Sequence, residues 1–468
     1  MWQQIYDFLD TLWGYPMLIL LVGGGLYYGI RTGFFQIRCL PLIFRKTFGE
    51  MFKKDKRAEM ESLEGTLTPF QALSTVLAGT VGAGNIAGVA TAIAVGGPGA
   101  LFWMWVTAIF GMMTKLAEVS LSIRYRKKGE DGEFYGGPMH YIRNGLGKKW
   151  SWLAAIFSVA MILLVLTDAS FVQVNTAAEA LHSAFSVPNY ITGIAIAVVS
   201  LVVVISGTKR IGQFCSAVVP PMCVLYIIAC LVVIFTHIGN VGSAFGMVFS
   251  YAFRPMSAVG GFAGSAVIVT MTKGGFRGIF SNEAGEGTAA TVHATAKTDH
   301  PIHQGFYGVT EVFIDTIIIC TLTGIALLSC GADLWNFVGS DGSMLEGVAL
   351  TFEAFRQTFG NVGVAIMGIC VFLFTFSSYL GFFVEFRTSL EYVFHEKAVK
   401  YLKWIFFIIP LFSAWLEVSV IWDLADMVVG FIFIPNMIAI LALSPQVIEM
   451  LKEYTAQCKA EKKALPGE

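Results

Sequence analysis

The residues of this chain best suited to bind a ligand interrupt two of its apolar segments. The first interruption is the sequence TVGAGN at residues 80–85, inside an apolar run over 69–96. Closely spaced glycines and an asparagine weaken a helix where no water is present to satisfy the freed backbone groups. Close helix packing is one explanation, because Gly84 and Gly88 form a small-xxx-small face. A ligand site is the other.

A break at TVGAGN would present opposite charges at its two ends. It would free the carbonyl oxygens from Ala78 to Val81, which end the first half-helix and suit a cation. It would also free the amide N–H groups from Gly82 to Gly84, which begin the second half-helix and suit a carboxylate. Thr80 and Asn85 would add side-chain oxygens for a hard monovalent cation.

The second interruption is MTKGGFRGIFSNEAGEGTAATVHATA, in the apolar run over 257–293. It contains five glycines, together with Glu283 and Glu286. A lipid-facing helix would not carry two carboxylates and so many glycines at membrane depth. The pattern favours a broken or re-entrant helix lining a cavity over a loop mistaken for a span.

Three further polar residues lie inside apolar runs. Gln173 could bind a substrate carboxylate or amide, or could bond only to a neighbouring helix, and Asp168 lies five residues before it. Asp315 is a lone acid in EVFIDTIIIC, which favours a cavity or ion-site role over a purely structural one.

The apolar runs also contain a cluster of hydroxyl side chains and a pair of opposite charges. Thr375, Ser377 and Ser378 cluster in FLFTFSSYLGFF, where hydroxyls commonly bond to their own helix. Lys115 and Glu118 are three residues apart on one helix, so we expect them to form an internal ion pair.

The composition is that of an integral membrane protein. Of 468 residues, 56% are hydrophobic and only 13% are charged, against about a quarter charged in soluble domains. The net charge of −1 gives no indication of a nucleic-acid partner, and the eight cysteines include no C-x-x-C pair. About eleven runs are long enough to span a membrane as helices: 14–33, 69–96, 98–122, 152–183, 190–206, 212–236, 257–293, 305–330, 361–386, 401–421 and 424–443.

Loop charges orient these spans. Most of the 31 Lys and Arg residues fall in alternate loops, beginning with the basic segment 34–68, and the opposite loops carry almost none. The positive-inside rule then puts the N-terminus outside, the C-terminus in the cytoplasm and the second span running outward. We expect a multi-pass protein of the cell (cytoplasmic) membrane.

The two interruptions open two groups of five spans with opposite direction. This pattern predicts an inverted repeat with a ligand site where the halves meet. The expected organisation follows in chain order: an N-terminal start and extra helix over 1–33, a basic cytoplasmic loop over 34–68, a first repeat over 69–236, a second over 257–443 and a cytoplasmic tail over 444–468.

Several segments resemble the sodium:alanine (and glycine) symporter family. GGPGALFWMWVTAIFG at 96–111 looks like the diagnostic motif of that family, and GTVGAGNIAG at 79–88 and FRGIFSNEAGEG at 276–287 look like further family segments. The resemblance runs through nearly the whole chain. It implies an all-α, LeuT-like core of ten helices, with a discontinuous first helix in each half.

The resemblance also implies roles for individual residues. Asn85 and Thr80 would lie near a sodium ion, and Gly82 and Gly84 would bind the amino-acid carboxylate. A further sodium site would join the carbonyls of Ala78 and Val81 to hydroxyls of a later helix. The substrate-site candidates are Thr80, Gly82, Gly84, Gln173, Phe280, Asn282 and Phe382, and the sodium-site candidates are Ala78, Val81, Asn85, Thr375, Ser377 and Ser378.

The implied function is import of a small neutral amino acid, coupled to Na⁺ as the transported ion. Two departures from the family pattern, Glu286 after NEAG and Phe382 in LGF, leave a larger substrate such as glutamine or serine open. A proton-coupled carrier is the alternative, with Asp168, Asp315, Glu283 or Glu286 as the titrating group. We expect no enzyme activity, because the chain lacks H-E-x-x-H, G-x-S-G and G-x-G-D motifs.

Overall fold

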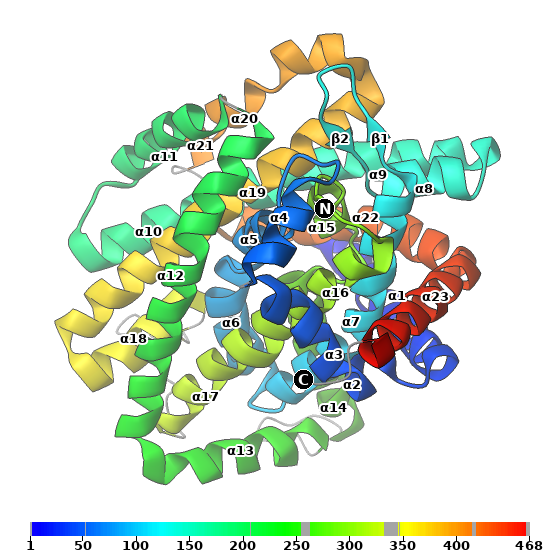
Figure 1. The fold of residues 1–468 in the computed structure, drawn as a ribbon. Coiled ribbons are helices and arrows are strands. Elements are labelled where there is room, and N and C mark those ends of the chain that lie inside the picture. The colour runs from blue at the N-terminus through cyan, green and yellow to red at the C-terminus, as the bar shows by residue number, and fades with distance from the viewer. Residues whose placement is uncertain are drawn as a thin grey trace.

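A computed structural model describes the backbone of residues 2–464 apart from 52, 206, 254–262, 332–344, 346 and 414–417. Its regular structure is helical except for one short hairpin, in which β1 (Lys127–Lys128) pairs antiparallel with β2 (Phe134–Tyr135). The helices pack side by side in a broad bundle (Figure 1).

The first half of the chain begins with α1 and ends with the long apolar helix α12. The N-terminal region comprises α1 (Trp2–Thr32), α2 (Phe35–Arg38), α3 (Leu40–Phe44), the π-helical turn η1 (Arg45–Gly49) and α4 (Lys54–Glu61). Next come α5 (Pro69–Thr80), η2 (Gly84–Gly88), α6 (Val89–Gly96), α7 (Ala100–Tyr125), α8 (Pro138–Gly145), η3 (Lys148–Trp150), α9 (Ser151–Leu164), η4 (Val165–Gln173), α10 (Val174–Phe185), α11 (Asn189–Val204) and α12 (Thr208–Thr236).

The second half of the chain contains the second helix break and further long helices. It comprises α13 (Ile238–Phe253), α14 (Ala263–Asn282), α15 (Thr288–His293), α16 (Pro301–Val312), η5 (Phe313–Cys320), α17 (Thr321–Ser329), α18 (Gly347–Phe359), α19 (Asn361–Leu402), α20 (Ile405–Ile408), α21 (Pro410–Ser413), α22 (Val418–Ala442) and α23 (Ser444–Ala464). The expected tail over 444–468 is therefore largely helical over its described part.

Several helices have the length and composition of membrane spans. Six in the described ranges qualify, and the bent pair Pro69–Thr80 and Gly84–Gly96 brings the number to as many as seven. The helices α11, α12 and α13 also expose large apolar side chains, among them Val202, Phe235 and Phe249. Exposed apolar surface on this scale is expected where a protein faces lipid.

Both predicted interruptions are helix breaks. The helix α5 begins with a capping box between Thr68 and Gln71 and ends at Thr80, after which the chain bends by 51° into η2 and α6. The second break falls between Asn282 and Thr288. The glycines Gly274 and Gly278 do not break α14 but let it approach α7, because a Cβ there would meet Ala100, Met104 and Thr107.

Three π-helical segments lie in the interior of the bundle. They are η2, η4 and η5, and each interrupts or extends a longer α-helix. A π-helical turn shifts the helix register by one residue and is frequent at functional sites. These segments carry Asn85, Gln173 and Asp315, three of the candidates expected from the sequence.

The hairpin is fastened to the second half of α19. Arg387 of α19 pairs with Asp131 and Glu133 of the hairpin turn, both at 2.6 Å. Figure 1 shows the hairpin beside the orange end of α19. This contact ties the connection between α7 and α9 to the second half of the chain.

Candidate functional site: the junction of the two broken helices

The first break exchanges backbone hydrogen bonds for side-chain ones. The last regular helical bond of α5 runs from the Val81 amide to the Leu77 carbonyl. The next amide, Gly82, donates to Asn85 Oδ1 at 3.0 Å, and Ala83 donates to Gln173 Oε1 at 3.2 Å. The carbonyls of Ala78 and Gly79 are thereby released from the amides that a continuous helix would have given them.

Asp315 joins the first break to the second. Its Oδ1 accepts from Asn85 Nδ2 at 2.6 Å, and its Oδ2 accepts from Ser281 Oγ at 2.9 Å. Thr316 Oγ1 donates to the same Oδ2 at 2.8 Å, and Asn282 Nδ2 donates to Thr316 Oγ1 at 3.1 Å. One fully buried carboxylate therefore holds Asn85 with its oxygen turned toward Gly82.

Gln173 bridges the first break to η4. Its Oε1 receives the Ala83 amide, and its Nε2 donates to Asp168 Oδ1 at 3.2 Å. Asp168 therefore fixes the orientation of the Gln173 amide group. The sequence left open whether Gln173 binds a substrate or only bonds to a neighbouring helix, and in the structure it accepts the Ala83 amide at the first break.

The helix α19 closes the opposite side of the break. Ser378 Oγ donates to the freed Gly79 carbonyl at 2.7 Å. A Cβ on Gly82 would lie 2.9 Å from Gln173 Oε1 and 3.0 Å from Ser378 Oγ. Glycine is thus the residue that fits between these two side chains.

The other hydroxyl candidates bond to their own helices. Thr80 Oγ1 donates to the Val76 carbonyl at 3.2 Å, Thr375 Oγ1 to Val371 at 2.8 Å, and Ser377 Oγ to Phe374 at 2.9 Å. All three are buried. The Asn282 side chain bonds within the second break, where its Oδ1 accepts a hydrogen bond from the Ala284 amide at 3.0 Å.

Aromatic candidates lie on α14 and α19. A Cβ on Gly84 would lie 3.4 Å from the Phe280 ring, so Phe280 borders the first break. The Arg277 guanidinium lies 5.6 Å from the centre of that ring and 3.6 Å from Asp426 of α22. Phe382 is fully buried in the core on α19.

The second break has a strained backbone and a network of buried acids. Glu283 has a φ of 53°, and Gly285 and Gly287 also have positive φ. The Glu283 carboxylate accepts from Thr288 Oγ1. Glu286 Oε1 is buried and has no hydrogen-bond partner among the described residues.

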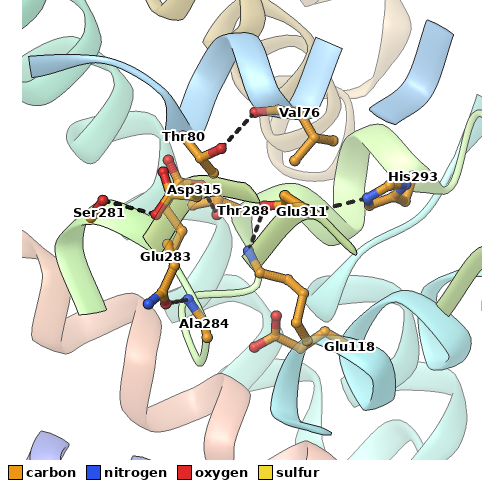
Figure 2. A network of polar contacts seen from close by, with 12 residues as sticks. Val76, Thr80, Glu118, Ser281, Glu283, Ala284, Thr288, His293, Glu311 and Asp315 are labelled. Carbon is orange, nitrogen blue, oxygen red and sulfur yellow. Dashed lines mark hydrogen bonds and ion pairs between the residues drawn. The ribbon is translucent and has the colours of Figure 1, made fainter. Parts of the chain in front are cut away.

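Glu118 of α7 binds the backbone of the second break. Its Oε1 accepts from the Gly285 amide at 2.8 Å and from Asn436 Nδ2 at 2.6 Å. Asn436 also donates to the Gly285 carbonyl at 2.8 Å. Figure 2 shows Glu118, Glu283 and Glu311 gathered around the same buried region.

The expected ion pair between Lys115 and Glu118 is wrong. Lys115 Nζ pairs instead with Glu311 Oε1 of α16 at 3.1 Å, and both side chains are fully buried. Glu311 also contacts His293 at 3.3 Å. The helix α16 packs along α7, which places the Glu311 carboxylate beside Lys115. Glu118 instead accepts hydrogen bonds from Gly285 and Asn436.

The sequence alone did not indicate several residues of this region. Ser281, Thr316 and Asn436 contact the candidates Asp315, Asn282 and Glu118 through pairs that are 34 to 318 positions apart, and Glu311 of α16 pairs with Lys115 of α7. Their types are common in spans, so the one available signal was that Ser281 lies inside the second interruption. Among the described residues, no group of three or more His, Cys, Asp or Glu has the arrangement of a metal site.

Comparison with known proteins decides the family. A sequence profile described as "Sodium:alanine symporter family" matches residues 1–466. The "Sodium/alanine symporter AgcS" of Methanococcus maripaludis is 39% identical over 456 residues, covering 97% of this chain and 97% of the relative. The chain belongs to the sodium:alanine symporter family. It is therefore a multi-pass membrane transporter and not an enzyme.

Two further likenesses extend the comparison. The "Probable sodium/glutamine symporter GlnT" of Bacillus subtilis is 34% identical over 466 residues, covering 98% of this chain and 93% of the relative. The structure of a Na⁺-coupled sialic acid symporter, solved in a substrate-bound outward-open state, matches with a TM-score of 0.53 at 12% identity, over 87% of this chain and 82% of that one. At this identity the structural likeness shows a shared fold.

Proposed function

We propose that this transporter imports a small neutral amino acid, of the alanine and glycine class, together with Na⁺ by alternating access. The observation that carries the proposal is the bond from Asn85 to Asp315 at the junction of the broken helices. That bond holds an amide oxygen, freed carbonyls and half-helix amides within one buried region. Cations and carboxylates are the ligands that such half-helix ends prefer.

The sodium ion would bind on the carbonyl side of the first break. Its proposed ligands are the carbonyls of Ala78 and Val81, with Ser378 and a hydroxyl from Thr375 or Ser377. The Ser378 hydroxyl already reaches the adjacent Gly79 carbonyl. The hydroxyls of Thr375 and Ser377 would have to exchange their intrahelical bonds for the ion. Asn85 and Thr80 would line the cation side of the same break.

The substrate carboxylate would bind on the amide side. Gln173 Oε1 now accepts the Ala83 amide at the start of the second half-helix, which is where an anion is favoured. A substrate carboxylate would take that amide and the one at Gly84, and Gln173 would turn to the substrate. Phe280 and Phe382 would limit the size of the substrate side chain, with Asn282 at the second break.

The proposed architecture has about eleven spans. Two five-helix halves, over 69–236 and 257–443, would have opposite direction in the cytoplasmic membrane, with the N-terminus outside and the C-terminus inside. Rocking of the bundle that contains both broken helices would switch access to the site. One charge crossing about 100 mV supplies about 2.3 kcal/mol, and a tenfold sodium gradient adds about 1.4 kcal/mol.

Uptake by purified protein in proteoliposomes tests the coupling ion and the substrate together. Radiolabelled alanine, glycine, serine and glutamine are offered with an inward sodium gradient, an inward proton gradient or neither. We expect sodium to drive accumulation of alanine, and Asn85→Ala to abolish it. Accumulation that is indifferent to sodium would refute sodium coupling, and a preference for glutamine would refute the substrate class alone.

A proton-coupled carrier is the second candidate, favoured by an unpartnered carboxylate oxygen at the second break. Glu286 Oε1 is buried without a hydrogen-bond partner among the described residues. A buried carboxyl without a partner favours its protonated form. If protons drive transport, Glu286→Gln will remove the response to a proton gradient. If sodium alone drives transport, the same variant will keep its response to a sodium gradient.

A further inference from the structure

A cavity separate from the two breaks lies between the N-terminal and C-terminal helices. Its volume is about 550 Å³, and the end of α1, the short helices α2 and α3, and α23 form its walls. Figure 1 shows α23, in red, beside α1 and α2. Tyr454 holds α23 against α16 by packing on His300 and Phe306, with ring centres 4.8 and 5.6 Å away.

The rim of this cavity is strongly basic. Five cationic side chains line it, and all five are exposed: Arg31, Arg38, Arg45, Lys452 and Lys459. Within the described part of the chain, Arg31 and Arg38 bond only to neutral oxygens, those of Tyr27 and Thr32. Among the described residues, no carboxylate forms an ion pair with any of the five.

Some other surface cations in the described part of the chain do have acidic partners. Lys127 pairs with Glu391 at 2.8 Å, and Arg356 pairs with Glu353 at 3.4 Å. The cavity rim therefore concentrates positive charge that no described carboxylate pairs with. An anionic ligand would supply the missing countercharge.

The remainder of the cavity is apolar and borders exposed apolar surface. Phe35, Leu42 and Leu451 contribute to its lining. Beside it, Ile30 and Ile37 are 64% and 58% exposed. Side chains of this kind are exposed stably where acyl chains cover them, so a ligand that combines a charged headgroup with acyl chains would match both parts of the cavity.

We propose that this cavity binds an anionic phospholipid, with the phosphodiester at the basic rim and the acyl chains along the apolar wall. Basic pockets between helices on the cytoplasmic side of a membrane suit anionic lipid headgroups. The volume lies in the range of sites for whole organic ligands, which favours a headgroup over a free phosphate ion. The inference depends on neither the coupling ion nor the amino acid carried.

Lipid binding to the full-length protein in detergent tests this proposal. Native mass spectrometry would measure retention of phosphatidylglycerol by the wild type and by the double variant of Arg38→Gln with Lys452→Gln. At about fivefold per charge lost, we expect about 25-fold weaker binding. The matched control is Lys148→Gln with Lys149→Gln, which removes two exposed charges outside the cavity and should bind as the wild type does.

Three results would overturn the proposal. They are equal phosphatidylglycerol binding by both double variants, equal binding of phosphatidylcholine by the wild type, and displacement of the lipid by inorganic phosphate at equal concentration. If the first variant is not monodisperse, Arg45→Gln with Lys459→Gln provides the same comparison.

Cysteine labelling of the wild-type protein provides a second test of lipid binding in this cavity. Cys39 lines the cavity and is half-buried, whereas Cys330 lies outside it with similar burial. Phosphatidylglycerol should slow maleimide labelling of Cys39 and leave Cys330 unchanged. An unchanged rate at Cys39 would contradict binding in this cavity.

Discussion

Gly82 offers the sharpest test of the proposed substrate site. Its φ is one that alanine can adopt, but the new Cβ would lie 2.9 Å from Gln173 Oε1 and 3.0 Å from Ser378 Oγ. Overpacking of this kind costs about 1 to 3 kcal/mol, which corresponds to about 5-fold to about 150-fold in an equilibrium constant. We expect Gly82→Ala to raise the KM for alanine uptake within that range, because Gln173 must move to admit the methyl group.

Gly79→Ala is the matched control for this experiment. Gly79 belongs to the same segment, yet a Cβ there would have no neighbour within 4 Å. In α5 the alanine should stabilise the helix by up to about 1 kcal/mol. Sodium-driven alanine uptake in proteoliposomes is measured for both variants, with thermal unfolding in detergent as the test of folding. A normal KM for Gly82→Ala, or an equal loss in Gly79→Ala, would refute the assignment of this clearance to the substrate site.

Three further predictions follow from other contacts. Lys115→Met leaves the fully buried Glu311 without its cation, so it should lower the free energy of unfolding by about 3 to 5 kcal/mol. Adding Glu311→Gln should recover most of this loss. If thermal unfolding shows no recovery, the pairing is contradicted. Phe382→Trp should shift uptake toward the smallest substrates in a competition screen, and an unchanged selectivity would remove Phe382 from the pocket. Burial raises the pKa of Asp299, but the hydrogen bond from His303 at 2.7 Å, the charge of His303 and backbone hydrogen bonds together lower that pKa below 3.8. Asp299 therefore stabilises the protein at pH values above its unfolded pKa. The melting temperature of wild type should exceed that of Asp299→Asn by its full amount at pH 7, and this difference should vanish as the pH falls below about 4. A difference that persists at low pH would contradict this.

Much of the fold could be predicted from sequence because its causes are local. Apolar runs of membrane length and the glycines of TVGAGN act within a few residues, and the breaks after Thr80 and Asn282 fall inside the expected segments. The position of the second break was less certain, because Gly274 and Gly278 resemble helix breakers. They serve close packing against α7 instead, and that role depends on a neighbouring helix.

Partners of buried polar groups could not be predicted in the same way. Lys115 and Glu118 lie at the right spacing for a pair, yet Lys115 bonds across to Glu311. A buried charge takes the best-placed counter-charge from any helix, because the penalty for leaving it unpaired exceeds any preference for a local partner. Sequence spacing within one helix carries no information about that choice.

The amino-acid sequence by itself determined the membrane class, the family and the two places where a helix had to break, since hydrophobicity and glycine content are properties of the segment. Tertiary structure decided what those breaks face. Asp315 meets Asn85 and Ser281 from positions 230 and 34 residues away, and α23 meets α1 across nearly the whole chain to form the basic cavity. Such contacts depend on how helices pack, and packing is settled by the whole bundle at once.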